Sequence, residues 1–436
     1  MKDCSTPHNM KKLLLFLSIF LFPQLVFSQL IQARFVSSVY GWQQQDTVGQ
    51  SSNHLFGYQT VQFSAAKDQF SFHTYWQGYN DFAGELKNKG QYRLYNLYLR
   101  ATNLFDVVDI TLGRQPVFAG VGTGTIDGGL AALKFFESQL KIVGYVGSLP
   151  PPLQKADIID KVKNNFMTGA QVVATPADYA QFSLSYMKRS IQPEVYTATR
   201  RDSLFNPYLI EIRPSAREER YLSGDFNADY EDIASLYGRI DYDLLLEKRS
   251  RFQLFTRVKP MEDVGLTAEY LQRDPRISYN SIFTAFTYNT LKEYQLGFEF
   301  SLPEDRMFFV RFGNLSYNDE NVRTITVGAN GQNMGASVST SAGYPGELTS
   351  GSLNLGYPMF ENTFTPTLLV SYARYKLSEN SPLEGTLSAG LGGVYRPMPE
   401  LSLDAQFQWI QNKIYKSDTR LFVRVSYLFL ERLDLF

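Results

Sequence analysis

The feature that most constrains this chain is a strict alternation of apolar and polar residues with a period of two. The clearest segment runs from 401 to 409, where Leu401, Leu403, Ala405, Phe407 and Trp409 alternate with Ser402, Asp404, Gln406 and Gln408. The same period recurs at 236–244, 294–301 and 387–395. A period of two places one apolar and one polar face on a β-strand. The chain is therefore predicted to be all-β.

A soluble β-sandwich has the same alternation, with its apolar face turned inward. Three features favour a membrane barrel instead. The alternating segments approach the ~9–11 residues that a tilted transmembrane strand needs. Their polar face carries many Gly, Ser and Gln residues, which suits a wet lumen. Aromatic residues make up 15% of the chain and crowd the strand ends, as at Tyr40, Trp42, Tyr75, Trp76, Tyr357, Tyr395 and Tyr427, where interfacial girdles form.

Short and long connections alternate along the chain. Tight turns are predicted at 66–68, 103–106, 137–138, 175–178, 303–306 and 397–400. Longer polar segments are expected to be loops at 82–90, 149–166, 190–220 and 318–348. This layout predicts an antiparallel up-and-down barrel of about 18 strands, with 16 to 20 compatible, short periplasmic turns and long extracellular loops. The segment 273–294 fits either one long hairpin or a loop and one strand.

The N-terminus has the pattern of a secretory signal peptide. Basic Lys11 and Lys12 precede an apolar stretch at 13–22, and Val26-Phe27-Ser28 offers a cleavage site before Gln29. Residues 1–28 are therefore expected to be the signal peptide and 29–436 a single barrel domain. A membrane anchor is the alternative, but the stretch is short and Pro23 interrupts it. Met10 begins a better signal than Met1.

Composition excludes several kinds of chemistry. The one cysteine, Cys4, lies within the expected signal peptide, which rules out disulfides, thiolate metal sites and thiol catalysis in the mature chain. The net charge of −1 gives no reason to expect nucleic acid. His73 shares a face with Ser71 and is the one lumenal candidate for a catalytic base, yet no partner motif accompanies it. We therefore predict no enzyme activity, no cofactor and no metal site. The alternating residues Asp225, Asn227, Asp229 and Glu231 are similar to the start of a calcium loop, but Tyr230 stands where such a loop requires glycine.

Three features resemble the porin-type outer-membrane proteins of diderm bacteria. The chain ends in Phe436, and the segment Val425-Ser-Tyr427-Leu-Phe429 fits the alternating C-terminal pattern of that family, although Arg432 and Asp434 depart from it. Leu112-Gly-Arg-Gln115, followed by a Gly-rich stretch and Asp127-Gly-Gly-Leu130, is similar to porin segments where a strand ends and the next loop folds into the pore. The layout of signal peptide and barrel is the third feature.

The resemblance implies a location in the bacterial outer membrane, contact with its lipid, and recognition of Tyr427, Phe429 and Phe436 by the barrel-assembly machinery. It also implies a homotrimer as one option. The function that follows is a channel for passive diffusion of small hydrophilic solutes, since barrels of ~16–18 strands leave an aqueous channel. The alternative is a non-conducting barrel that acts as scaffold, receptor or adhesin through its loops, of which 190–220 is the longest charged one.

Charged residues on the inferred polar faces are the candidates to line the pore. They carry both signs, so they fit either a selectivity-setting ring or an internal ion-pair network. Arg114 shares the parity of lipid-facing Leu112, so either a bulge at Gly113 turns it inward or it extends to the head groups. The Gly-rich stretch 117–129 is interpreted either as a loop that needs close backbone approach and could form a constriction, or as a plain surface turn. The predicted pore-lining residues are Arg114, Asp127, Arg239, Asp241, Asp243, Arg257, Glu269, Glu299, Asp404 and Arg424.

Overall fold

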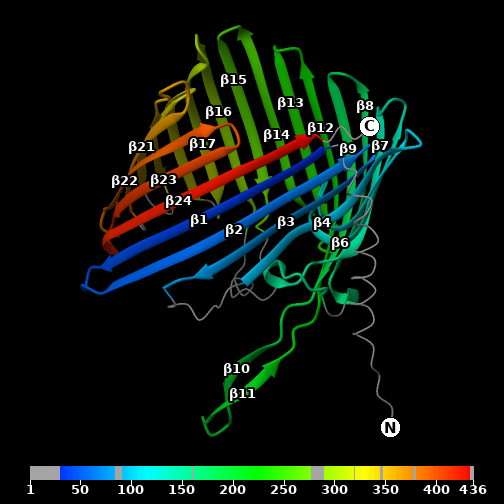
Figure 1. Cartoon of the computed structure of the whole chain (residues 1–436), viewed down its shortest axis with the longest axis horizontal. Helices are drawn as coiled ribbons and strands as arrows, with labels where there is room; N and C mark the ends of the chain where they lie inside the picture. Colours follow the sequence, from blue (N-terminus) through cyan, green and yellow to red (C-terminus); the bar gives the residue numbers. More distant parts are fainter. Residues whose placement is uncertain are drawn as a thin grey trace.

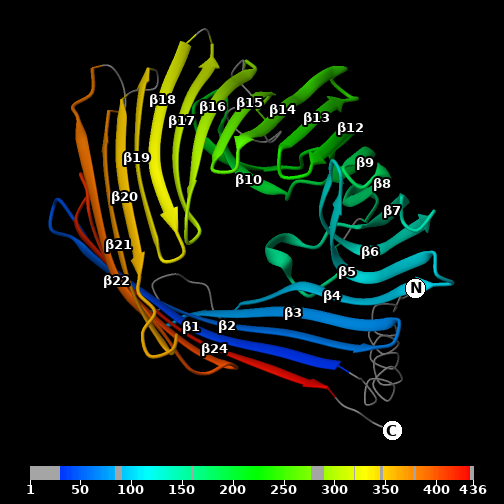
Figure 2. The ribbon, with the colours of Figure 1, turned by 90° about the horizontal axis from the view of Figure 1, so that it is seen from above.

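The computed structural model describes residues 30–83, 91–159, 162–275, 289–318, 320–343, 347–376 and 380–432. Residues 1–28, where a signal peptide is expected, and Phe436 lie outside these ranges. Within them, the chain forms one closed antiparallel barrel of 22 strands, in which β1 pairs with both β2 and β24 (Figure 1, Figure 2). The helices in the described ranges are too short to cross a bilayer.

Strands follow one another around the barrel in chain order, except that a separate two-stranded hairpin stands between β9 and β12. The wall begins with β1 (Leu30–Asp46), β2 (Ser51–Lys67), β3 (Phe70–Asp81), β4 (Gln91–Leu104), β5 (Val108–Ala119), β6 (Gly122–Phe135), β7 (Leu140–Ser148), β8 (Phe166–Ala177) and β9 (Ala180–Ile191). The separate hairpin is β10 (Tyr196–Arg201) and β11 (Pro207–Ile212). Two 3-10 turns precede β8, η1 (Pro152–Gln154) and η2 (Val162–Asn164).

The rest of the wall is built entirely of neighbouring antiparallel hairpins. It comprises β12 (Arg217–Tyr230), β13 (Ala234–Asp243), β14 (Lys248–Met261), β15 (Val264–Arg273), β16 (Leu291–Leu302), β17 (Arg306–Tyr317), β18 (Glu320–Gly331), β19 (Met334–Gly343), β20 (Leu348–Gly356), β21 (Phe364–Tyr375), β22 (Glu384–Met398), β23 (Leu401–Gln411) and β24 (Tyr415–Arg432).

The predicted count of about 18 strands, with a range of 16 to 20, is wrong. Part of the difference lies in segment 318–348, which was expected to be a loop and instead contains β18 and β19. These strands carry Ser and Thr on one face and small apolar residues on the other, so their alternation is weak. Thr326 and Ser339, for example, face each other across the two strands and share a hydrogen bond of 2.9 Å. Ser and Thr differ less from the apolar face than charged or amide side chains would, so the contrast that identifies a strand is weak here.

The two ends of the barrel differ in their connections. All six predicted tight turns lie at one end, where non-glycine residues such as Asp68, Asn103 and Asp305 adopt positive φ. The opposite end carries the connections 149–165 and 192–216, and we call it the long-loop end. The β10–β11 hairpin projects from this end, away from the barrel (Figure 1).

The outer face of the barrel is apolar, as the alternation predicted. Along β16, Tyr294, Leu296 and Phe298 are exposed, while the intervening residues are half-buried on the inner face. A water-soluble β-sandwich would bury these side chains, so their exposure identifies the face that meets lipid. Tyr40, Trp42 and Tyr75 are exceptions to the predicted girdle, because they lie on the inner face.

Tyr40 and Trp42 belong to an aromatic cluster inside the barrel. Trp42 stacks on His54 and Phe56 of the neighbouring strand, with ring centroids 4.5 and 5.3 Å apart. Tyr40 contacts Trp42 at 5.1 Å. Their proximity to a strand end suggested a membrane boundary, but their parity with inward residues decides their position.

Candidate functional site

The tip of the β5–β6 hairpin leaves the barrel wall and folds against its inner face. β5 pairs with β4 only between Leu97 and Leu104, and its ladder with that strand ends at Arg114. β6 likewise pairs with β7 no further than Asp127. Beyond these points, residues 115–126 pair only with each other. We call this segment the infolded hairpin.

Two glycines permit the departure from the wall. Gly113 has a φ of +124°, which L side chains rarely adopt, and a Cβ there would overlap the carbonyl oxygen of Leu97. A Cβ on Gly128 would overlap the carbonyl oxygen of Val146. The stretch 117–129 is thus not a plain surface turn. It belongs to a bent hairpin with the close backbone approach that was expected of it.

The infolded hairpin is held by an apolar cluster on the inner wall. Val117 and Ile126 are completely buried, and so is Met167 of β8. Met187 and Tyr145 complete the contact surface. These wall residues lie on the face opposite the exposed Val146, Val172 and Leu184, which places the cluster inside the barrel.

The turn of the infolded hairpin also makes polar contact with the wall. The backbone amide of Val121 donates to Ser185 Oγ at 2.9 Å, and that hydroxyl is buried. Gly120 and Gly122 lie so close to the wall that a Cβ on either would overlap Ser185 or the Tyr145 hydroxyl. The tip therefore packs so closely on the wall that one added carbon atom would overlap it. On the other face of the tip, Phe118 remains 80% exposed.

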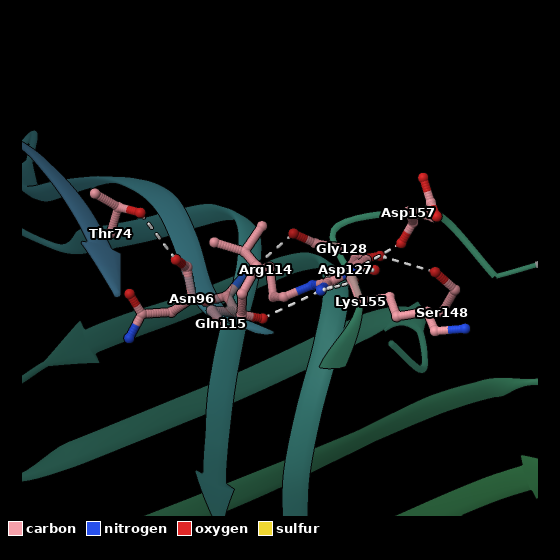
Figure 3. Close-up of polar contacts among 10 residues, drawn as sticks. Thr74, Asn96, Arg114, Gln115, Asp127, Gly128, Ser148, Lys155 and Asp157 are labelled. Carbon is pink, nitrogen blue, oxygen red and sulfur yellow. Dashed lines mark hydrogen bonds and ion pairs between the residues drawn. The ribbon is translucent and has the colours of Figure 1, made fainter. Parts of the chain in front are cut away.

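Arg114 ties the base of the infolded hairpin to two other segments (Figure 3). Its guanidinium forms a bidentate pair with Asp127, with Nε–Oδ1 and Nη2–Oδ2 distances of 2.6 and 2.8 Å. It also donates to the carbonyl oxygens of Leu94 at 3.1 Å, Lys155 at 2.5 Å and Asp157 at 3.0 Å. Its side chain is 5% exposed. Arg114 thus joins the part of β4 that does not pair with β5, the infolded hairpin and loop 149–165.

The alternatives for Arg114 are decided in part by this geometry. The side chain does not extend to head groups, because it is buried among carbonyl oxygens. No register shift accompanies Gly113 in the ladders with β4 and β6, so the change of direction comes from the positive φ and not from an extra residue. Lys155 and Asp157 were missed, because backbone carbonyls leave no sequence signature.

The predicted charged residues of β13 lie on the inner face and are paired. Asp241 is fully buried, and its carboxylate accepts hydrogen bonds from Ser223 Oγ at 2.6 Å and from Arg239 Nε at 2.8 Å. Asp243 accepts from the backbone amides of Leu245 and Leu246, and so caps the following turn.

The remaining predicted lumen charges also form cross-strand contacts. Arg257 donates to Glu299 at 2.8 Å, and Glu269 accepts from Gln253 at 2.6 Å. Arg424 pairs with Asp404 between β23 and β24. Arg239–Asp241, Arg257–Glu299 and Arg424–Asp404 are thus ion pairs, whereas Asp243 and Glu269 accept from neutral donors. This arrangement matches the ion-pair interpretation more closely than a ring of one sign.

The other candidates lie apart from the infolded hairpin. His73 Nε2 is 2.9 Å from Ser71 Oγ, and the ring stacks on Tyr98 at 4.8 Å. No cluster of three or more potential metal-ligating side chains occurs in the described ranges. Tyr427 is exposed on the outer face and Phe429 is partly buried, while Phe436 lies outside the described residues.

Comparison with known proteins gives matches in structure alone. Neither a protein-family model nor a curated protein matches the sequence. A variant of the ferric enterobactin receptor PfeA from Pseudomonas aeruginosa aligns with a TM-score of 0.58 at 10% identity, over 91% of this chain and 81% of that one. The P pilus usher PapC translocation pore gives 0.44 at 8% identity, over 91% and 99%, and OccK2 from P. aeruginosa gives 0.43 at 8%, over 92% and 98%.

The likeness to PfeA shows a shared fold. The chain has the fold of an outer-membrane β-barrel protein, as the porin-type resemblance implied.

Proposed function

We propose that the protein is an outer-membrane channel through which small hydrophilic solutes diffuse, with a bore set by the infolded hairpin and loop 149–165. The observation that carries this proposal is the infolded hairpin itself. Barrels of 22 strands are wide enough to need a plug, whereas those of 16–18 strands are open channels. A wall segment turned inward narrows a wide barrel without filling it.

The lining of the lumen supports hydrophilic cargo. Ion pairs occupy one part of the inner wall, such as Arg257–Glu299, and hydroxyl pairs such as Thr324–Ser341 occupy another. Paired charges cancel at short range, so we expect little preference between cations and anions. Outer-membrane lipid would surround the barrel, and assembly would depend on Tyr427, Phe429 and Phe436. Homotrimer formation stays a proposal by family analogy.

The test is single-channel conductance of the refolded mature chain in a planar bilayer. Gly122→Ala should dislodge the tip, because the added methyl overlaps the Tyr145 hydroxyl. We expect stable conductance steps from the wild type and a changed or fluctuating step size from Gly122→Ala. Gly144→Ala is the matched control on the neighbouring strand, since its Cβ would meet nothing within 4 Å.

Two outcomes would contradict the proposal. A wild-type barrel that migrates as a folded species but gives no conductance steps would exclude an open channel. Equal conductance in Gly122→Ala and Gly144→Ala would exclude the infolded hairpin as the element that sets the bore.

A receptor or adhesin role is the second candidate, and the β10–β11 hairpin favours it. This hairpin projects from the long-loop end, and Leu204, Phe205 and Leu209 are 77%, 75% and 73% exposed. Apolar side chains this exposed on a projecting hairpin suit contact with a partner. If residues 196–212 are replaced by a short Gly-Ser link and conductance is unchanged, the hairpin serves a purpose other than conduction.

A further inference from the structure

Basic residues mark the outer face of the barrel at the long-loop end. Six strands each place one Lys or Arg there, close to the strand's end. We call this set the basic rim; it consists of Lys188 (β9), Arg220 (β12), Arg249 (β14), Lys292 (β16), Arg323 (β18) and Arg374 (β21).

Parity shows that these side chains leave from the outer face, except that Arg249 follows a register shift and is placed there by its pairing with exposed Tyr242. Two residues further into the strand from Arg220 stands exposed Leu222, and the same spacing relates Lys292 to exposed Tyr294 and Arg323 to exposed Ile325. Residues two apart on a strand share a face. The basic rim therefore continues the apolar outer face and does not belong to the lumen.

Strand register makes part of the basic rim continuous. Lys292 pairs with Gln272 of β15, whose side-chain oxygen accepts from Arg249 Nη2 at 2.7 Å. On the far side, Lys292 pairs with Ser316. Arg374 pairs with Thr349 of β20, and Thr349 pairs in turn with Thr340 of β19. The residues between the basic ones are thus hydrogen-bonding side chains.

An aromatic cluster on the outer face lies next to this part of the basic rim, further along the strands from the long-loop end. Tyr270 contacts Phe252 and Tyr294, with ring centroids 5.9 and 4.8 Å apart, and the Arg249 guanidinium lies 5.5 Å from the Phe252 ring centroid. Such rings gather at the boundary between acyl chains and head groups. Moving along β16 from Leu296 to Tyr294 to Lys292 therefore crosses from apolar to interfacial to charged.

Four of the six residues of the basic rim form no ion pair within the described ranges. They are the exposed Arg249, Lys292, Arg323 and Arg374. Lys188 and Arg220 share the single carboxylate of Glu218. At the opposite end, by contrast, outward Arg306 is paired with Glu304. An anionic surface at the long-loop end would supply the missing counter-charge.

We propose that the basic rim binds the phosphate groups of lipid head groups in the leaflet at the long-loop end. The ligand class is a membrane lipid with a phosphate-bearing head group, because the cations stand directly above lipid-facing side chains and away from the lumen. The inference rests on the membrane setting of the proposed function but not on conduction. It also fixes orientation, since the long-loop end must face the more anionic leaflet.

The experiment measures lipid binding to the refolded chain in detergent by native mass spectrometry. Diphosphorylated lipid A is the probe, and the same glycolipid without phosphates is the comparison. The test variant combines Arg249→Gln, Lys292→Gln and Arg323→Gln. The matched control combines Lys67→Gln, Arg306→Gln and Arg432→Gln, which remove equal charge at the opposite end.

We expect the wild type to prefer the phosphorylated lipid by at least tenfold. The test variant should bind it about 100-fold more weakly, since each basic residue beside an anionic surface contributes roughly fivefold. The control variant should bind as the wild type does. Gel mobility before and after heating verifies that every variant is folded.

Three results would overturn the proposal: equal binding of both lipids by the wild type, equal weakening in the two variants, or displacement of the lipid by millimolar inorganic phosphate. The last would assign the basic rim to soluble anions. Conductance of the same variants separates this outcome from failure of the channel proposal, because the basic rim lies outside the lumen.

Discussion

The Arg114–Asp127 pair should be far more important for stability than the similar Arg424–Asp404 pair. Both join an arginine to an aspartate on a neighbouring strand. The Arg114 side chain is 5% exposed and Asp127 16%, whereas Arg424 is 43% exposed. Removing one partner of a buried pair leaves an uncompensated charge and costs about 3–5 kcal/mol. An exposed pair contributes only ~0–1 kcal/mol.

The perturbation is Arg114→Met, with Arg424→Met as its matched control. Arg114→Met also removes the donors to the carbonyl oxygens of Leu94, Lys155 and Asp157, so the loss should fall at the upper end of the range. Adding Asp127→Asn to Arg114→Met should restore part of the loss, because no charge then remains unpaired. A coupling of about 0.5–3 kcal/mol is expected from the double-mutant cycle.

Equilibrium unfolding in guanidinium, with the barrel in lipid vesicles, measures these differences. The three tryptophans of the chain report the transition, and gel mobility reports the folded fraction. The reasoning is refuted if Arg114→Met destabilises the barrel no more than Arg424→Met does. A cycle without coupling would instead show that the carbonyl contacts, and not the ion pair, stabilise the site.

Two further predictions concern the parts that flank this site. Met167→Ala should destabilise the barrel by about 2–5 kcal/mol, since the side chain is completely buried against the infolded hairpin; thermal unfolding measures it, and a loss under 1 kcal/mol would mean that the hairpin readily fills the space. The backbone amides of Asn206 and Leu204 donate to Asp202 and hold its pKa below the usual 3.8. Since the folded pKa of Asp202 is lowered, the stabilisation of the β10–β11 turn by its carboxylate is present above pH 3.8 and is lost as the pH falls through the folded pKa. Hydrogen exchange of residues 202–206 should therefore accelerate below about pH 3.8. Asp202→Asn should remove this pH dependence.

The class of fold followed from alternation because a period of two is a direct consequence of strand geometry. The faces of 236–244 and 294–301 are as predicted, since bulky apolar residues occupy nearly every second position of each segment, with Gly238 as the exception. The strand count failed where that contrast is weak, as in β19, whose Ser337, Ser339 and Ser341 face inward. Local contrast in polarity, and not strand propensity, was the usable signal.

The candidate site was predictable only in part. Arg114, Asp127 and the glycines between them were singled out, and the structure brings them together. The direction of the hairpin was not predictable, because it depends on how closely Gly113 and Gly128 approach the backbones of the flanking strands β4 and β7. The basic rim had a signal that sequence reasoning missed, namely a Lys or Arg two residues from an apolar position at the same end of several strands.

The short ladder between β4 and β5 has a consequence for how the closed barrel comes apart. These strands pair only from Leu97 to Leu104, whereas β1 and β24 pair from Leu30 to Asp46. Opening a ring requires the rupture of one seam, and the seam with the fewest bonds opens at the lowest free energy. The chain ends therefore do not form the weak point of this ring. Transient local opening of the barrel should begin between β4 and β5, and the contacts of Arg114 should limit how often this opening occurs.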